Sequence, residues 1–114
     1  TLNDFFELAD FFYNLPEYNT ELLIWKDVSK QKIKENLQKI YKIFEGIRDP
    51  NFTISELEIS LAPLTEKLGK GEILWPMRAA LSGKKESPGP YEIAEILGRD
   101  EVLHRLEFAI QKLI

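Results

Sequence analysis

The sequence has 114 residues, a net charge of −4 and no cysteine, and 44% of its residues are hydrophobic and 30% charged. This length allows one domain at most, or a piece of a larger protein, and the composition excludes a disordered chain and a membrane span of roughly 20 apolar residues. The chain can form no disulfide and no thiolate metal site, and its acidic balance restricts any nucleic-acid site to a local patch.

The first predicted element is an aromatic-rich helix in residues 3–13, NDFFELADFFY. Thr1 or Asn3 can cap it, and the helix is expected to stop before Pro16, because a residue that precedes proline is pushed out of the α region. Its apolar face follows helical spacing, with Phe5, Leu8, Ala9 and Phe12. The next apolar run, residues 21–26, is compatible with a short helix or with an extended segment that places Trp25 in the core.

Two longer helices are predicted in the middle of the chain. Ser29 can cap the first, which should end between Gly46 and Pro50, and Thr53 can cap the second with Glu56 as its capping-box partner. The apolar stripes of the two helices contain Ile33, Leu37, Ile40, Tyr41, Phe44 and Ile47, and then Leu57, Leu61, Leu64 and Leu68. Within the second helix Pro63 predicts a kink, and Gly69 occupies the position of a left-handed C-cap.

The last third of the chain predicts further helices. After a link at 69–71, an apolar helical pattern runs from Ile73 to Leu81 and stops at Gly83, with Pro76 in a first turn or at a bend and Trp75 in the core. Residues 91–97 form a short helix closed by Gly98, and a final helix begins at Arg99 or Asp100. The fold class is therefore all-α, a compact bundle of about five to six helices. We expect a single domain or fragment over 1–114, with a first part at 1–50 and a second at 51–114.

Residues suited to catalysis are scarce. His104 is the single histidine, no cysteine accompanies it, and we expect it to be structural, because neither a metal site nor a nucleophile pair can be built from it. The link 69–71 lacks the spacing and the hydroxyl of a phosphate-binding loop. The many carboxylates are explained by solvated helix faces. No residue pattern predicts a catalytic or metal site.

Positive charge and rigid turn residues coincide in and around the stretch of residues 74–92. The basic residues Lys67, Lys70, Arg78, Lys84, Lys85 and Arg99 outnumber the acidic Glu72 and Glu86 there. The turn Ser87-Pro88-Gly89 leads into a helix N-terminus, where unpaired N–H groups and the helix dipole favour an anion. This arrangement is typical of a site for an anion or for single-stranded nucleic acid. The alternative is a capped turn whose lysines serve solubility.

The same residues resemble a known family. The stretch LWPMRAALSGKKESPGPYEIAEILGRDEVLHRLEFAI is similar to the C-terminal end of bacterial-type glutamyl-tRNA synthetases, with an Arg-x-Ala-Leu-Ser-Gly run, a Ser-Pro-Gly turn and a Leu-Gly-Arg step. The beginning of the chain, TLNDFFELADFFYNLPEY, and the segment WKDVSKQKIKENLQKIYKIF also resemble that family. The resemblance covers the whole chain and is strongest from Gly71 onward.

The resemblance implies an α-helical cage that binds the anticodon loop of tRNA(Glu). It places the anticodon contacts at Arg78, Ser87, Pro88, Gly89 and Pro90, with Lys84 and Lys85 attracting the RNA backbone. Many members of the family have another apolar residue where this chain has Pro90, which lacks a backbone N–H.

Further expectations concern the rest of the protein. The motifs of the family's catalytic domain are absent, so the chain is expected to be an excised part of a glutamate–tRNA ligase. ATP and Mg²⁺ would then bind in the parent enzyme, with no cofactor here. The catalytic domain of the same polypeptide is an expected partner, and we expect a cytoplasmic monomer without membrane contact. The alternative is a helical protein-interaction module on this scaffold, docking through its Phe-rich first helix and without a tRNA role.

Overall fold

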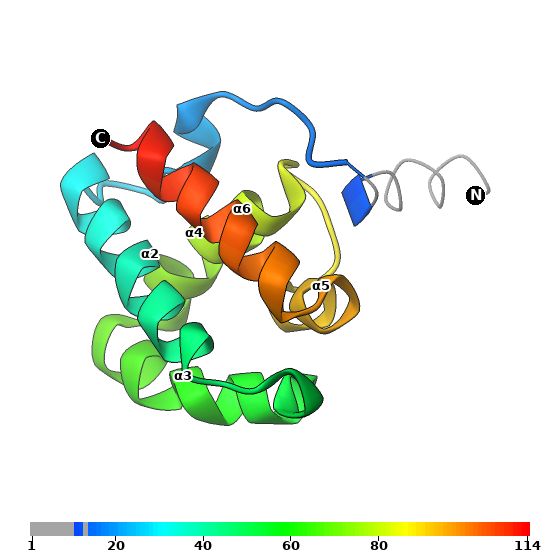
Figure 1. Cartoon of the computed structure of the whole chain (residues 1–114). Helices are drawn as coiled ribbons and strands as arrows, with labels where there is room; N and C mark the ends of the chain where they lie inside the picture. The colour runs from blue at the N-terminus through cyan, green and yellow to red at the C-terminus, as the bar shows by residue number, and fades with distance from the viewer. Residues whose placement is uncertain (1–10, 13) are drawn as a thin grey trace.

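The computed structural model describes residues 11, 12 and 14–114, and every long element in this part of the chain is an α-helix (Figure 1). The elements are η1 (Thr20–Leu23), α2 (Lys30–Glu45), η2 (Asp49–Asn51), α3 (Ile54–Leu68), α4 (Lys70–Ser82), α5 (Pro90–Leu97) and α6 (Arg99–Lys112). Among the described residues there is no strand, which confirms the all-α class. The helix predicted at residues 3–13 falls almost entirely outside the described residues.

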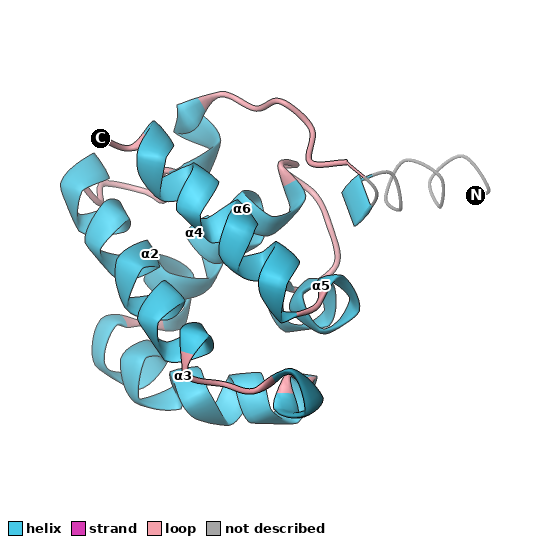
Figure 2. Ribbon diagram, in the orientation of Figure 1, coloured by secondary structure: helices cyan, strands magenta, loops and turns pink. Residues whose placement is uncertain are grey.

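Helix α4 is the centre of the fold. It contacts α2, α3, α5, α6 and η1, and Figure 2 shows the other helices arranged around it. Its side chains Ile73, Met77 and Ala80 are fully buried, together with Leu37 of α2 and Leu106 of α6. The buried side of α4 therefore anchors in the hydrophobic core the same helix that carries the exposed residues of its other side.

The predicted helix caps are largely confirmed. The Ser29 hydroxyl accepts a hydrogen bond from the Lys32 amide, and Thr53 accepts one from the Glu56 amide at 3.4 Å. The amide of Thr53 itself donates to the Asn51 carbonyl, so it does not donate to Glu56 as the reciprocal half of a capping box would require. Both helices nevertheless begin at the predicted residues.

The first part of α4 differs from the prediction. The link 69–71 was expected as a turn, but Gly69 alone reverses the chain with a φ of 97°, and α4 begins at once with Lys70. Pro76 consequently lies inside α4 and is buried, and the prediction of a first-turn position is wrong. Similarly, α3 continues from Ile54 to Leu68 through Pro63. Packing of each helix against the rest of the bundle offsets the hydrogen bond that its proline removes.

The run at residues 21–26 combines the two predicted alternatives. A short 3-10 helix, η1, ends at Leu23, and Trp25 follows it outside the helix, half-buried against the first turn of α4. The Trp25 ring lies so close to Gly71 that a Cβ atom on this glycine would stand 2.7 Å from Cε2 of the ring. A glycine at this position therefore lets the 20–26 segment lie directly on α4.

We expect Gly71→Ala to lower the free energy of unfolding by about 1 to 3 kcal/mol, because the added methyl group displaces the Trp25 ring. Alanine favours a helix over glycine by about 1 kcal/mol, which offsets part of this loss. Urea unfolding measures the change, with the same substitution in a Trp25→Ala background as the control. An equal loss in both backgrounds would show that the contact with Trp25 is not the cause.

Candidate nucleic-acid interface

The loop of residues 83–89 joins α4 to α5 and contains the predicted turn (Figure 2). Gly83 ends α4 in the left-handed region, with φ 66° and ψ 18°, as predicted for a helix stop. The buried Ser82 then fixes the next residue, because its hydroxyl accepts from the Lys84 amide at 3.1 Å and donates to the Lys84 carbonyl at 3.2 Å. The beginning of the loop is thus set by the end of α4.

Arg78 holds the loop in place. Its Nη1 donates to the Ser87 hydroxyl at 3.2 Å and its Nη2 to the Lys85 carbonyl at 2.9 Å. The Ser87 hydroxyl in turn donates to the Pro88 carbonyl at 3.0 Å. The structure thus brings together Arg78 and Ser87, two of the residues at which the resemblance places anticodon contacts. Some of the hydrogen-bonding groups of Arg78 and Ser87 are used within the loop and fix its shape. The other donors of the Arg78 guanidinium are therefore held in a fixed orientation.

The Pro88, Gly89 and Pro90 side of the turn is partly exposed and leads into α5. Gly89 is the N-cap residue and Pro90 the first residue of α5, a position at which the missing N–H of proline costs the helix nothing. Glu92, in the first turn, places its carboxylate within 3.8 Å of the position that a Cβ on Gly89 would take. This acidic group already provides negative charge at the N-terminus of α5, which makes that end a poor phosphate site.

The predicted basic cluster is smaller in the structure than in the sequence. Lys85 is exposed, and Lys84 is half-buried and has an interaction partner within the chain. Arg99 lies elsewhere, since it donates to the Ile47 carbonyl at 2.9 Å and to the Glu45 carbonyl at 2.8 Å, at the end of α2. Lys70 stands eight residues from Arg78 on α4, about 12 Å along the axis. Arg78, Lys84 and Lys85 are therefore the cations at the turn.

Trp75 is not the core residue that the sequence predicted. It is half-buried, and the guanidinium carbon of Arg78 lies 4.9 Å from the centre of its ring. The indole N–H donates to the Leu22 carbonyl at 3.2 Å. Trp75 precedes Arg78 by three residues, so both lie on one helix face, and this spacing could have identified it. The candidate surface therefore extends from the turn to Trp75.

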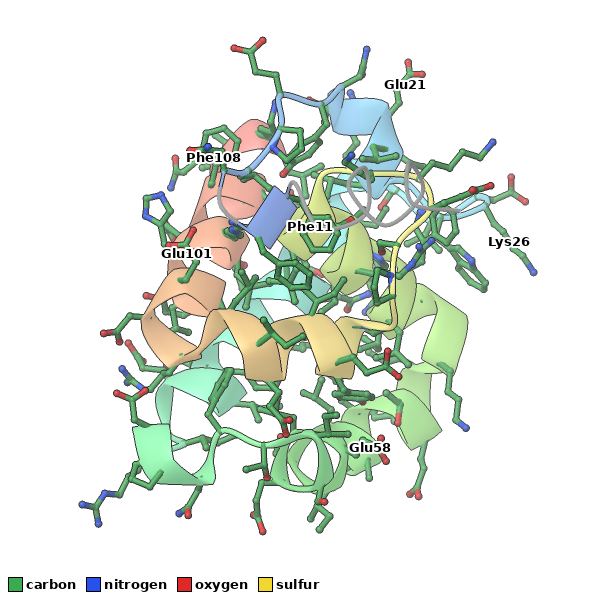
Figure 3. The ribbon with its side chains drawn as sticks, turned by 90° about the vertical axis from the view of Figure 1, so that its right-hand side faces the viewer. Phe11, Glu21, Lys26, Glu58, Glu101 and Phe108 are labelled. Atoms are coloured by element: carbon green, nitrogen blue, oxygen red, sulfur yellow. The ribbon has the colours of Figure 1, made fainter. Side chains whose placement is uncertain are left out.

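A surface hollow of about 440 Å³ opens beside this arginine–tryptophan pair. Its wall combines the loop with the segment before α2, and the lining residues are Tyr18, Asn19, Glu21, Leu22, Trp75, Gly83 and Lys85. Burial raises the pKa of Tyr18 to about 12, so this side chain is neutral at physiological pH. Figure 3 shows Glu21 extending from η1 at one end of the molecule, opposite Glu58 on α3.

Arg105 was also not identified from the sequence, because this residue lies between apolar residues of the last helix and nothing in the pattern indicates a structural role. Its side chain is 1% exposed, and Nη1 donates to the Leu81 carbonyl at 2.7 Å. Its Nε donates to Glu101, 2.9 Å away and four residues earlier on α6. A buried arginine thus joins α6 to the last turn of α4, two residues before Gly83.

The described residues contain no group of three or more histidine, cysteine or acidic residues that could hold a metal ion. His104 is exposed on α6 and lines a different hollow, beside Pro16 and Phe108.

Among the residues that the structure describes, no helix is long and apolar enough to cross a bilayer. Around Arg78 the described residues place hydrogen-bond donors beside the aromatic ring of Trp75.

Comparison with known proteins gives concordant matches. A family model described as an anticodon binding domain matches residues 1–110. The chain is 40% identical over 116 aligned positions to a glutamate–tRNA ligase of Clostridium kluyveri, covering 98% of this chain and 24% of that protein. It is 38% identical to the ligase of Clostridium tetani and 35% to that of Clostridium acetobutylicum, over 98% and 97% of this chain and 24% of each relative. The chain spans about a quarter of the length of the curated relatives that it matches.

Proposed function

The chain belongs to the family of anticodon binding domains, in the form that occurs in glutamate–tRNA ligases, and from this premise we propose that it binds the anticodon loop of tRNA(Glu). The observation that supports the proposal is the arrangement of Arg78. Its guanidinium is fixed by Ser87 and by the Lys85 carbonyl, and it lies on the Trp75 ring. A planar donor held in one orientation can distinguish base edges without first losing side-chain freedom on binding.

The proposed contacts fall into two classes. Arg78, Ser87, Pro88, Gly89 and Pro90 form the turn that reads unpaired bases, through hydrogen-bond donors and the faces of the two prolines. Lys84 and Lys85 stand beside the turn and attract the phosphate backbone, which adds affinity without sequence preference. Base contacts would therefore determine which tRNA is selected, and lysine contacts how strongly any RNA is held.

The proposal assigns the chain one role within a larger enzyme. The parent is a glutamate–tRNA ligase whose catalytic domain lies in another part of the polypeptide and contacts this domain. ATP and Mg²⁺ bind in that catalytic domain, and the present chain binds neither. We place the enzyme in the cytoplasm, where the chain acts as a monomer. Binding of the anticodon here positions the distant acceptor end of the tRNA for attachment of glutamate.

Titration of the chain with the isolated anticodon stem-loop of tRNA(Glu) tests the proposal, with a stem-loop of scrambled anticodon as the control. We expect weak but selective binding, since the stem-loop carries only part of the contacts of a whole tRNA. Equal affinity for the two stem-loops would overturn the proposal and favour the alternative of a protein-interaction module.

We expect Lys85→Ala to weaken binding of the cognate and the scrambled stem-loop by the same factor. Each phosphate contact contributes about −0.7 to the slope of log affinity against log salt for a single strand, so the slope should become less steep by about this amount. Affinities measured over a series of salt concentrations give the slope. Lys42→Ala on α2 is a matched control, because it removes one lysine charge without touching the turn. An unchanged slope for Lys85→Ala would remove this lysine from the interface.

A further inference from the structure

The hollow beside Trp75 has the walls of a site for a flat aromatic ligand. Its volume of about 440 Å³ falls among those of pockets that accept small ligands, and two aromatic residues, Trp75 and Tyr18, line it. The Trp75 indole is held in place by its hydrogen bond to the Leu22 carbonyl at 3.2 Å. A ring already fixed in this way loses little freedom when a second ring stacks on it.

The charges around the hollow determine which part of a nucleotide can enter. Glu21 and Lys85 are both exposed and both line it. The Glu21 carboxylate repels a phosphate but accepts hydrogen bonds from the N–H groups of a base edge. Lys85, on the loop side, attracts a phosphate that remains outside. An unpaired base inside the hollow can donate a hydrogen bond to the Glu21 carboxylate while its phosphate lies beside the Lys85 ammonium.

The position of the hollow connects it to the turn. Gly83 and Lys85 belong to both, and Arg78 contacts the Trp75 ring that forms one wall. A single strand bound at Ser87 and Pro88 therefore has a second place for a base within reach of the next nucleotides. The segment before α2, through Tyr18 and Leu22, forms another part of the wall.

We propose that the hollow lined by Trp75, Tyr18 and Glu21 binds one unpaired base of the RNA loop, next to the base or bases read at the turn. This inference rests on the proposed function, which it extends by adding a second base site outside the turn. Stacking on Trp75 supplies the affinity, and the Glu21 carboxylate favours a base that presents an N–H donor.

The test combines a Trp75 variant with stem-loops in which each loop nucleotide in turn is abasic. Trp75→Leu should lower the affinity for the intact stem-loop about 5- to 150-fold, the range expected for loss of one stacked base. With the abasic site at one particular position, the same substitution should cause no further loss. Loss of affinity that is the same for every abasic position, or no loss at all, would overturn the inference.

Trp25→Leu is the matched control, since it removes the other of the two tryptophans, which packs against Gly71 and does not line the hollow. It should leave the affinity unchanged. Trp75→Phe keeps a ring but loses the N–H donor to Leu22, and it should restore most of the binding. Circular dichroism verifies that each variant is folded.

A second measurement leaves the hollow intact. In Trp25→Phe, Trp75 is the single remaining tryptophan, and its fluorescence should be quenched by the intact stem-loop but not by the stem-loop that is abasic at the responsive position. Absence of quenching by either would also overturn the inference. If the unmodified chain distinguishes cognate from scrambled stem-loops while Trp75→Leu binds normally, the second base site fails and the proposed function stands. If the unmodified chain does not distinguish them, the proposed function itself fails.

Discussion

Replacing Arg105 with alanine should lower the free energy of unfolding by about 3 to 5 kcal/mol. The side chain is 1% exposed, so its removal leaves a cavity between α4 and α6, and the buried Leu81 carbonyl loses the donor that lies 2.7 Å away. A domain of this size has a total stability of about 5 to 15 kcal/mol, so the loss is a large fraction of the whole. Urea unfolding monitored by circular dichroism measures it.

Two further substitutions separate the causes. Arg105→Met retains most of the volume of the side chain but removes its bonds to the Leu81 carbonyl and to Glu101, so its remaining loss of about 1 to 3 kcal/mol measures the two contacts together. Glu101→Gln retains an acceptor for Nε and removes only the charge of a partner that is 45% exposed, which should cost about 1 kcal/mol or less. A loss for Glu101→Gln as large as that for Arg105→Met would show that the ion pair, and not the bond to α4, stabilises this contact.

Arg78→Ala should weaken binding of the cognate anticodon stem-loop by about 1 to 3 kcal/mol and reduce discrimination against a swapped anticodon. The substitution removes a donor for a base edge and also the two hydrogen bonds, to Ser87 and to the Lys85 carbonyl, that fix the loop. This prediction rests on the proposed function. The measurement is the ratio of dissociation constants for the two stem-loops.

Arg78→Lys should restore little of the discrimination, because a single ammonium cannot make both loop hydrogen bonds with the geometry of a planar guanidinium. Ser87→Ala removes one of the two loop acceptors and should have a smaller effect than Arg78→Ala. Unfolding of all three variants should differ little from that of the unmodified chain, since these contacts are at the surface. Equal weakening of cognate and swapped stem-loops by Arg78→Ala would exclude this residue from base recognition.

The starts and ends of several helices could be predicted from the sequence because the residues that determine them act locally. Ser29, Thr53 and Gly83 act on neighbouring residues of their own helix, and each has its predicted role in the structure. The first-turn alternative for Pro76 was wrong because this position depends on where α4 begins, and the abrupt reversal at Gly69 decides this. Packing against the rest of the bundle then retains a proline that an isolated helix would not accommodate.

The candidate site was predictable only in part, because some of its contacts are local in sequence and others join distant residues. The pairing of Arg78 with Ser87 spans nine residues and follows from one helix and one turn. The bond of Trp75 to Leu22 spans 53 residues, and Arg99 reaches back 52 residues to Ile47. Such distant partners are fixed by tertiary packing, which no local pattern encodes, so Trp75 was assigned to the core and Arg99 to the basic cluster.

The central position of α4 also has a consequence for motion. Because α4 is enclosed by the other helices, its amides around Met77 and Ala80 should exchange with solvent only when the whole domain unfolds. The amides of Lys85 and Glu86, on the exposed loop, should exchange through local opening. The amides of α4 should thus exchange much more slowly than those of the loop that it carries. Binding of a ligand at the loop should slow the exchange of the Lys85 and Glu86 amides and leave the exchange of the α4 amides unchanged.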